Sequence, residues 1–473
     1  MGKEVAHCGF EPRQFDLFTR RLRDETALLD RMLAQGRFAE DRYMAGFELE
    51  AWIVDRNFFP LPINDEFLER LGSPLVVPEL SRFNVELNGE PQLPAGCGLQ
   101  RMEDELNGTW RECLRAAHEL EATLVMIGIL PTVRNADLCV ENMSSRNRYR
   151  VLNDQVLALR QGRPIHLSIR GREHIDLRHD DVMLEAAGTS FQVHLQCPAS
   201  RYARYFNASL LLSGVTVAVA ANSPFLFNTS LWEETRIPLF QQAVDTGIAR
   251  SPETHRVSFG SGYLSGQSLD SFRENLDHYP VLLPELFDEP PERLRHLRLH
   301  NGTIWRWNRP LIGFDDDRPH LRVEHRPMAA GPSVADMMAN AALYYGLVHA
   351  LATRPLPPEA ELPFSTARDN FYAGARDGLE AQIVWLDGRS RPLRALLREE
   401  ILPMAEAGLA ALGVDDEVRG RYIDILQGRA RTGQNGAAWQ RAHVEKYGRD
   451  FMRLTADYLD RQRSGLPVHE WDV

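Results

Sequence analysis

The segment at residues 46–50, Gly46-Phe47-Glu48-Leu49-Glu50, alternates polar and apolar side chains. Neighbouring side chains in a β-strand point to opposite faces, so Glu48 and Glu50 share one face while Phe47 and Leu49 share the other. The pattern therefore predicts a strand over residues 46–54 whose apolar face covers a core. Two carboxylates remain together on the polar face of this strand.

Three other segments alternate in the same way and predict strands at 84–88, 188–196 and 318–326. Their polar faces carry, in chain order, Asn84, Glu86 and Asn88, then Ser190, Gln192, His194 and Gln196, and finally Arg322, Glu324 and Arg326. If the four strands belong to one sheet, its polar face combines glutamates with a glutamine, a histidine and arginines.

This combination of side chains favours phosphoryl transfer. Carboxylate, amide and imidazole groups suit divalent cations such as Mg²⁺ or Mn²⁺. Arginines beside them bind phosphate or carboxylate through two parallel hydrogen bonds. Phosphoryl transfer needs such positioning and charge neutralisation. The alternative is an antiparallel sheet with one solvated face, which alternates in the same manner. The ordered series of four strands favours the functional interpretation.

Composition excludes several other classes of protein. The chain has 473 residues and a net charge of −12, which argues against nucleic acid as a partner. Only Lys3 and Lys446 are lysines, and no GxxxxGK[ST] loop is present. A lysine Schiff base therefore has almost no candidate, and bound phosphates must be held by arginine and metal. The five cysteines include no CxxC pair, as in a cytosolic protein with reduced thiols.

The remaining pattern is mainly helical. Periodic apolar residues predict helices over 12–38, 99–126, 208–221 and 334–351, and a mostly helical chain from 379 onward. A strand and turn are expected at 126–131, and a Pro-rich linker at 355–363. Residues 251–303 show no regular pattern and predict a long irregular segment.

The order of these motifs resembles the glutamate–cysteine ligase family of the glutamine-synthetase-like superfamily, in particular its plant and proteobacterial-type branch. The resemblance covers roughly residues 40–355. The matching segments are Gly46–Glu50, Glu79 with Val85-Glu86, Gly188–His194, Ala221-Asn222-Ser223-Pro224-Phe225, Arg236, Thr303-Ile304-Trp305 with Arg309, and Glu324 with Arg326.

The resemblance implies an α+β fold in which a curved, mainly antiparallel sheet forms a funnel with helices outside. We expect a catalytic domain over residues 1–378 and a helical C-terminal part, 379–473, packed on it. The implied cofactors are ATP and Mg²⁺, with Mn²⁺ as a possible substitute. The implied reaction is the ligation of glutamate to cysteine through an acyl phosphate, a step of glutathione biosynthesis.

The same resemblance assigns roles to individual residues. The predicted metal ligands are Glu48, Glu50, Glu86, Gln192 and Glu324. Predicted catalytic residues are His194, Arg309 and Arg326. The arginines predicted to bind ATP are Arg309, Arg326 and Arg322, and the residues predicted to bind the amino-acid substrates are Arg236 and Asn88.

Two departures from the family pattern leave the substrate open. Asn88 stands where the family often has threonine, and Pro327-Met328-Ala329-Ala330 follows Arg326 where the family commonly has aspartate. The alternatives are a carboxylate–amine ligase with a different acid or amine, and a phosphotransferase related to guanidino kinases. The sequence shows no secretory signal and no apolar run of membrane-spanning length. We expect a cytoplasmic monomer or homodimer with small-molecule partners, without nucleic acid or membrane.

Overall fold

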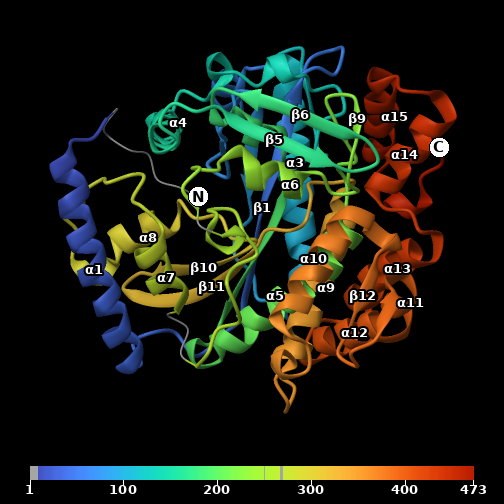
Figure 1. Cartoon of the computed structure of the whole chain (residues 1–473). Coiled ribbons are helices and arrows are strands. Elements are labelled where there is room, and N and C mark those ends of the chain that lie inside the picture. Colours follow the sequence, from blue (N-terminus) through green and yellow to red (C-terminus); the bar gives the residue numbers. More distant parts are fainter. Residues whose placement is uncertain (1–8, 250, 267–269) are drawn as a thin grey trace.

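The computed structural model describes residues 9–249, 251–266 and 270–473. A curved antiparallel sheet lies at its centre, in the strand order β10-β11-β7-β1-β3-β2, and β4 pairs with the end of β1 (Figure 1). Its strands are β1 (Met44–Val54), β2 (Val76–Pro78), β3 (Asn84–Asn88), β4 (Thr123–Val125), β7 (Phe191–Cys197), β10 (Asn308–Asp315) and β11 (Arg318–His325). The predicted α+β fold with a curved antiparallel sheet is confirmed.

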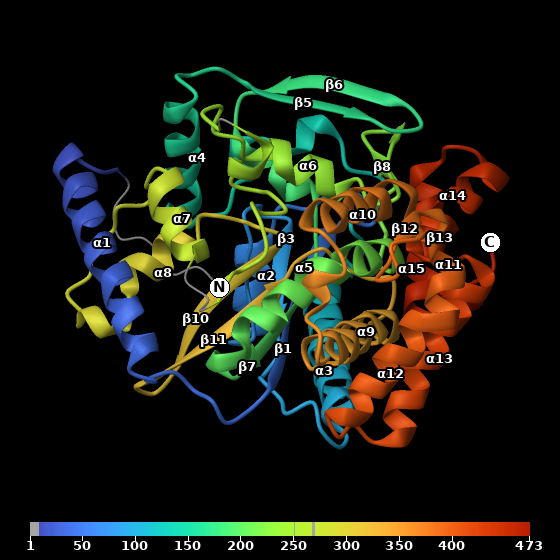
Figure 2. The same ribbon diagram turned by 60° about the horizontal axis from the view of Figure 1, so that its bottom comes forward.

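The apolar face of the sheet packs against two buried helices, α5 (Tyr202–Val219) and α9 (Val334–Ala352) (Figure 2). Every residue of α5 from Tyr205 onward is buried, which explains why its sequence is apolar on all sides. Tyr345 of α9 donates its hydroxyl to the carbonyl of Gly46 at 2.8 Å and so ties the helix to β1. These helices fix which face of the sheet remains polar.

The C-terminal helices extend the helical layer, with α12 and α13 packed on α9 and α10 packed on α5. They are α10 (Phe364–Asp377), α11 (Leu393–Leu396), α12 (Leu402–Ala411), α13 (Asp416–Thr432), α14 (Gly436–Tyr447) and α15 (Phe451–Ser464), with a hairpin of β12 (Gln382–Val384) and β13 (Ser390–Pro392). Arg429 of α13, only 1% exposed, pairs with Asp336 of α9 at 2.8 Å. One apolar core runs through both parts of the chain. A domain boundary at residue 378 stays a prediction.

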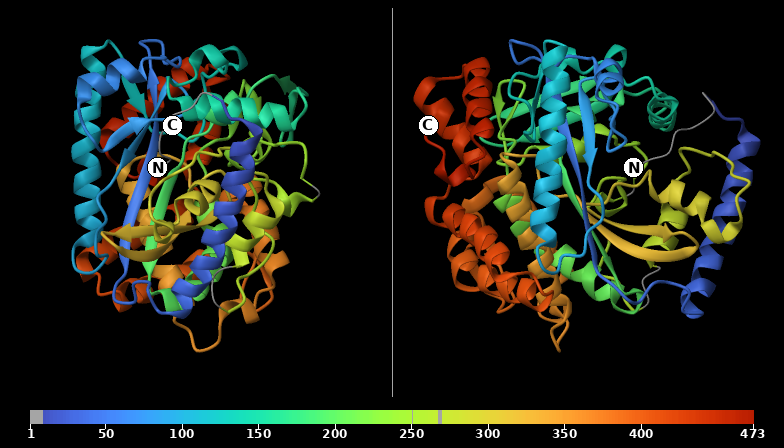
Figure 3. Two further views of the ribbon diagram at one scale, coloured as in Figure 1. Left: turned by 90° about the vertical axis from the view of Figure 1, so that its left-hand side faces the viewer. Right: turned by 180° about the vertical axis from the view of Figure 1, so that it is seen from behind.

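The edge of the sheet at β10 is covered by α8 (Arg295–Asn301) and α7 (Asp270–His278), with α1 (Pro12–Ala34) outside them (Figure 3). His296 of α8 and Glu25 of α1 hold these helices together, with Nδ1 and Oε1 2.5 Å apart. The other elements are α2 (Asn64–Leu71), α3 (Gly98–Glu119), α4 (Asn147–Leu159), α6 (Arg236–Ala243), β5 (Ile165–Arg170), β6 (His174–His179), β8 (Phe225–Leu226) and β9 (Thr229–Ser230).

Some expected elements differ from the structure. The helix expected over 99–126 ends at Glu119, and the strand expected at 126–131 lies at Thr123–Val125. The segment 251–303, expected to be irregular, contains both α7 and α8. Within the described residues, no helix combines the length and apolar character needed to cross a membrane.

Candidate active site

Strand register brings the polar faces of the four predicted strands together. Glu48 of β1 lies opposite Gln192 of β7, and His194 of β7 lies opposite Glu324 of β11. Side chains opposite each other in an antiparallel pair point to the same face. The predicted strands therefore share one sheet, and their polar residues share one face of it.

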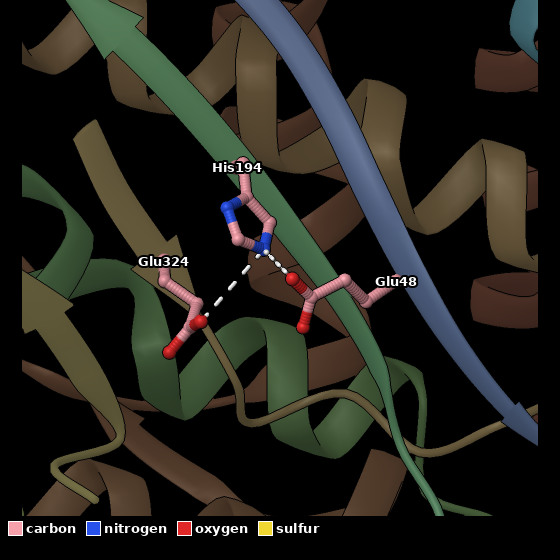
Figure 4. A group of neighbouring side chains, drawn as sticks. All are labelled: Glu48, His194 and Glu324. Carbon is pink, nitrogen blue, oxygen red and sulfur yellow. Dashed lines mark ion pairs between the residues drawn. The ribbon is translucent and has the colours of Figure 1, made fainter. Parts of the chain in front are cut away.

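Glu48, His194 and Glu324 form the centre of this face (Figure 4). The Nε2 atom of His194 lies 3.4 Å from Oε1 of Glu48 and 3.8 Å from Oε1 of Glu324. The carboxylates are 8% and 0% exposed, and Nε2 of His194 is buried without a hydrogen-bond partner. Two carboxylate oxygens and an imidazole nitrogen within 4.8 Å of one another form a donor set that fits a divalent cation.

Two arginines hold Glu324 in its charged form. Arg309 donates from Nε to Oε2 at 2.6 Å and from NH2 to Oε1 at 2.8 Å, and Arg326 donates to Oε2 at 3.1 Å. Burial alone would raise the pKa of Glu324, but Arg309, Arg326 and His194 lower it to about 2. Arg326 also donates to the side-chain oxygen of Gln192. Both arginines thus lie beside the candidate metal ligands, as the sequence predicts.

Glu50 and Glu86 form a second acidic pair further along the same face, because β1 and β3 place them opposite each other. Glu50 accepts hydrogen bonds from the backbone N–H of Ser190 at 2.7 Å and from the side chain of Gln192 at 2.9 Å. Asn88 donates to Oε1 of Glu86 at 3.0 Å. Gln192 therefore connects this pair to Arg326.

The acidic pair has two further carboxylates as neighbours, Glu79 and Glu185. Burial raises the pKa of Glu50 and of Glu79 to about 7, and that of Glu185 to about 8. Burial and the charges of Glu48 and Glu79 raise the pKa of Glu86 well above its usual range. Four carboxyl groups that oppose ionisation in one place favour a counter-charge such as a cation.

The sequence pattern did not mark Glu185 as a site residue. It lies in a short 3₁₀ turn (Val182–Ala187) before β7, where no strand alternation marks it. Glu79 belongs to a family motif in the sequence but is not among the predicted site residues. It follows β2 directly and lies two residues after Val77, whose partner in β3 is Glu86. Its position directly after the strand that pairs with Glu86 could have identified Glu79 as a site residue.

Arg236 lies at the start of α6 and is 4% exposed. Its Nε lies 3.3 Å from Oε1 of Glu234, and its NH2 donates to the carbonyls of Arg326 at 3.3 Å and Pro327 at 2.5 Å. These contacts hold the backbone that follows Arg326. Binding of a substrate carboxylate by Arg236 stays a prediction.

The segment 326–332 is also held by the C-terminal helices through Asn222. The fully buried Asn222 side chain donates to the carbonyl of Ala330 at 2.7 Å and to the hydroxyl of Tyr458 at 2.8 Å. Gln462 donates to the carbonyl of Pro332 at 2.5 Å. Helix α15, which carries Tyr458 and Gln462, thus supports the backbone at Ala330 and Pro332, downstream of Arg326.

Arg322 lies on the polar face two residues before Glu324 and opposite Gln196 of β7. Burial lowers the pKa of Arg322, and the nearby charges of Glu48 and Glu324 oppose that effect. The structure thus places all the predicted metal ligands and His194 on one face, together with Arg309, Arg322 and Asn88 and with Arg326 directly after β11. Their roles in binding and catalysis remain predictions.

Residues 44–456 match the sequence family described as glutamate-cysteine ligase family 2. The family resemblance inferred from the motifs is thereby confirmed, and the match extends beyond residue 355 into the C-terminal helices. A search of curated proteins finds no match.

Two solved structures share the fold at low sequence identity. One is glutamate–cysteine ligase from Francisella tularensis in complex with AMP, 12% identical, with a TM-score of 0.53 over 90% of each chain. The other is a bifunctional glutathione synthetase from Pasteurella multocida, 11% identical, with a TM-score of 0.53. That match covers 93% of this chain and 55% of the other.

Proposed function

We propose that this chain, which belongs to glutamate-cysteine ligase family 2, joins the γ-carboxylate of glutamate to the amino group of cysteine. Family membership makes it an ATP-dependent ligase that links a carboxylate to an amine. The observation that carries the proposal is the polar sheet face, where Glu48, His194 and Glu324 meet next to Arg309 and Arg326. That face supplies candidate ligands for cations and for phosphate in one place.

Glu48, Glu324 and His194 would hold one divalent cation, either Mg²⁺ or Mn²⁺. Glu50 and Glu86, with the side-chain oxygen of Gln192, would hold another. Bound cations supply charge neutralisation that lets an anionic carboxylate approach a phosphate. Their proposed ligands come from four different strands, so the sheet itself sets the spacing of the donor atoms.

Arg326 is proposed to bind a phosphate of ATP, because its guanidinium lies between Gln192 and Glu324 and so between the two candidate cation sites. Arg309 uses Nε and NH2 to hold Glu324. Its NH1 donates only at 3.3 Å to the carbonyl of Gly302, a long contact that a phosphate oxygen could replace. Both arginines would then bind phosphate without releasing the metal ligand.

The proposed reaction has two steps. An oxygen of the substrate carboxylate attacks the γ-phosphorus of ATP, and the bond to the bridging oxygen of ADP breaks. The product is an acyl phosphate, whose carbonyl carbon is more electrophilic than that of a carboxylate. The neutral amine then attacks this carbon and loses one proton to the leaving phosphate or to water, an amide bond forms, and phosphate leaves with the carboxylate oxygen.

The experiment is a product analysis with glutamate, cysteine and Mg-ATP. We expect γ-glutamylcysteine, ADP and inorganic phosphate in equal amounts. Oxygen-18 supplied in the glutamate γ-carboxylate should appear in the released phosphate. Formation of AMP and pyrophosphate would contradict the acyl-phosphate mechanism.

A different acid or amine is the second candidate, and it rests on the two departures from the family pattern. Asn88 directs its amide to Glu86 in place of a threonine hydroxyl. The segment after Arg326 is apolar, and its backbone carbonyls are occupied by Arg236 and Asn222. ADP release that depends on an amine other than cysteine would support this candidate and retain the mechanism.

A further inference from the structure

One end of the polar face carries nitrogen donors without partners, on the side away from Glu50. Gln196 of β7 and Arg322 of β11 lie opposite each other. His320 lies two residues before Arg322 and therefore points to the same face. This group lies next to the Glu48, His194 and Glu324 cluster, because Glu324 and His194 are the adjacent register pair.

These donors are buried and unsatisfied. Gln196 is 4% exposed and His320 is 6% exposed. Within the described part of the chain, Nε2 of Gln196, Nε of Arg322 and both ring nitrogens of His320 are buried without a hydrogen-bond partner. Burial lowers the pKa of His320 to about 4, so its neutral ring contributes one N–H donor and one acceptor nitrogen. Buried polar groups in folded proteins are nearly always paired, so a cluster of unpaired donors indicates an absent acceptor.

Arg298 of α8 lies at the edge of the sheet beside this group, near enough to Arg322 and His320 for its charge to act on both. Asn301 of that helix donates to the carbonyl of Pro310 at 2.7 Å, which fixes α8 along the edge strand β10. The guanidinium of Arg298 lies 5.2 Å from the centre of the Phe314 ring. Burial lowers the pKa of Arg298, and the neighbouring charges of Arg295 and Arg322 lower it further.

The cations in this group exceed the anions. Among the described residues, no carboxylate lies within ion-pair distance of Arg298 or Arg322. Glu48 and Glu324 act on Arg322 from further away, and each already faces His194. Glu289 acts on Arg298 from further away and already pairs with Arg295 at 3.2 Å. Asp315, with Oδ2 3.6 Å from Nδ1 of His320, is half exposed and also lies 3.7 Å from Arg42. Arg298 and Arg322 are each partly exposed, and guanidinium groups that are partly removed from water without a counter-ion favour an anionic ligand.

We propose that Arg298, Arg322, Gln196 and His320 bind an anionic oxygen group of a substrate. The group is either a phosphate of the nucleotide or a carboxylate of an amino acid, since both offer several acceptor oxygens to guanidinium and amide donors. The assignment of the group to a substrate rests on the proposed ligase function, because the donors adjoin its candidate metal ligands. It adds Arg298, Gln196 and His320 to the site.

The first test compares Arg298→Gln with Arg293→Gln. Both arginines stack on Phe314, at 5.2 and 5.1 Å, but Arg293 lies 3.4 Å from its own partner Asp317. Titration calorimetry would measure the affinity of each purified variant for Mg-ADP, Mg-ATP, inorganic phosphate and L-glutamate. We expect Arg298→Gln to weaken the binding of its ligand about tenfold or more, because a charge-assisted hydrogen bond is lost. Arg293→Gln should bind as the wild type does.

Gln196→Met provides a second variant that keeps the side-chain length and removes the unpaired donor. It should weaken the same ligand as Arg298→Gln. Loss of affinity for the nucleotides and phosphate identifies a phosphate site, and loss for glutamate identifies a carboxylate site. Equal affinities in Arg298→Gln and Arg293→Gln, or a wild-type protein that binds none of the four probes, would overturn the proposal.

Calorimetry tests the anion site at Arg298 independently of the proposed glutamate–cysteine ligase activity. A protein that forms no γ-glutamylcysteine, yet binds nucleotide or phosphate through Arg298, refutes the glutamate–cysteine activity and keeps the anion site. A protein that forms γ-glutamylcysteine with unchanged binding in Arg298→Gln keeps the activity and refutes the anion site. Thermal unfolding of each variant verifies that it is folded.

Discussion

Arg309 and Glu324 face each other across β10 and β11, and two parallel hydrogen bonds of 2.6 and 2.8 Å join the guanidinium to the carboxylate. Glu324 is fully buried, so its charge depends on the arginines around it. The pair therefore holds a candidate metal ligand, Glu324, in a fixed position. It also contributes to the stability of the fold, and a single substitution can remove that contribution.

We expect Glu324→Gln to lower both activity and stability. The change leaves Arg309 and Arg326 buried beside a neutral amide, and removing one partner of a buried ion pair costs about 3–5 kcal/mol. Urea unfolding would measure the loss. Glu119→Gln is the control, because Glu119 pairs with Arg70 at 3.3 Å where both side chains are 56% exposed. It should change stability by less than about 1 kcal/mol.

Glu50→Gln should separate activity from stability. Glu50 resists ionisation because burial and the neighbouring Glu86 raise its pKa to about 7. Replacing it with an amide keeps its shape and removes repulsion at pH 8, but it leaves either the N–H of Ser190 or the amide of Gln192 without an acceptor. The two effects oppose each other, so the melting temperature of the metal-free protein should change little. Turnover should fall by orders of magnitude if Glu50 is a metal ligand. Wild-type turnover at saturating Mg²⁺ would contradict that role.

The metal-free protein should become less stable as the pH rises from 6 to 8.5. Glu50 and Glu79 have pKa values of about 7 and Glu185 of about 8, all above the usual value of 4.5 for glutamate. The folded state therefore binds more protons than the unfolded state above pH 4.5, and stability is lost as the pH passes these values. Thermal unfolding should show this loss, and Mn²⁺ should reverse it. A flat profile in chelator would refute the shared acidic cluster.

Tyr458→Phe should reduce turnover through the segment 326–332. The hydroxyl donates to the carbonyl of Met126 at 2.9 Å and accepts from Asn222, which holds Ala330. We expect a stability loss of about 1–2 kcal/mol and a lower kcat, because Arg326 loses part of its support. Tyr422→Phe is matched, since the hydroxyl of buried Tyr422 donates to Glu103 of α3 at 2.6 Å and makes no hydrogen bond to this segment. It should cost similar stability and leave kcat unchanged, and equal kcat values in both variants would refute the coupling.

Gly436→Ala should destabilise the contact between α14 and Asn222. A Cβ atom at Gly436 would lie 2.0 Å from Oδ1 of Asn222 and 2.9 Å from Cγ of Pro332. Such overpacking typically costs about 1–3 kcal/mol. Gly420→Ala in α13 is the control, because a Cβ atom at Gly420 would have no described atom within 4 Å. That change should stabilise the protein by about 0.5–1 kcal/mol, since alanine favours a helix interior.

Strand alternation predicted the four strands that carry most of the site, but not the whole sheet. The strand predicted at 84–88 is β3 itself, and those predicted at 46–54 and 318–326 correspond to β1 and β11 within two residues. The predicted shared face follows because a period of two fixes which side chains lie together. The sequence pattern did not reveal β10 or the hairpin of β5 and β6, whose pairing depends on contacts made by the folded chain.

The sequence indicates which residues form the site better than it indicates how these residues contact one another. The sequence predicts that Arg309 binds phosphate. In the structure Arg309 lies opposite Glu324, a position that depends on the register of β10. Alternation in β11 alone does not determine that register. Arg236 was expected at a substrate carboxylate, but its bonds to the carbonyls of Arg326 and Pro327 require the packing of α6 against the end of β11. Glu185 lies in a 3₁₀ turn, where the alternation of polar and apolar residues does not indicate which side chains share a face.

The strand order has a consequence for synthesis of the chain on the ribosome. β7 occupies the middle of the sheet, between β1 and β11, but β11 is translated much later than β7. Until β11 emerges, one edge of β7 has open backbone donors and acceptors that another nascent chain could pair with. Aggregation during expression should therefore depend on how quickly residues 198–325 follow, and a chain that stalls before β11 should need chaperone protection.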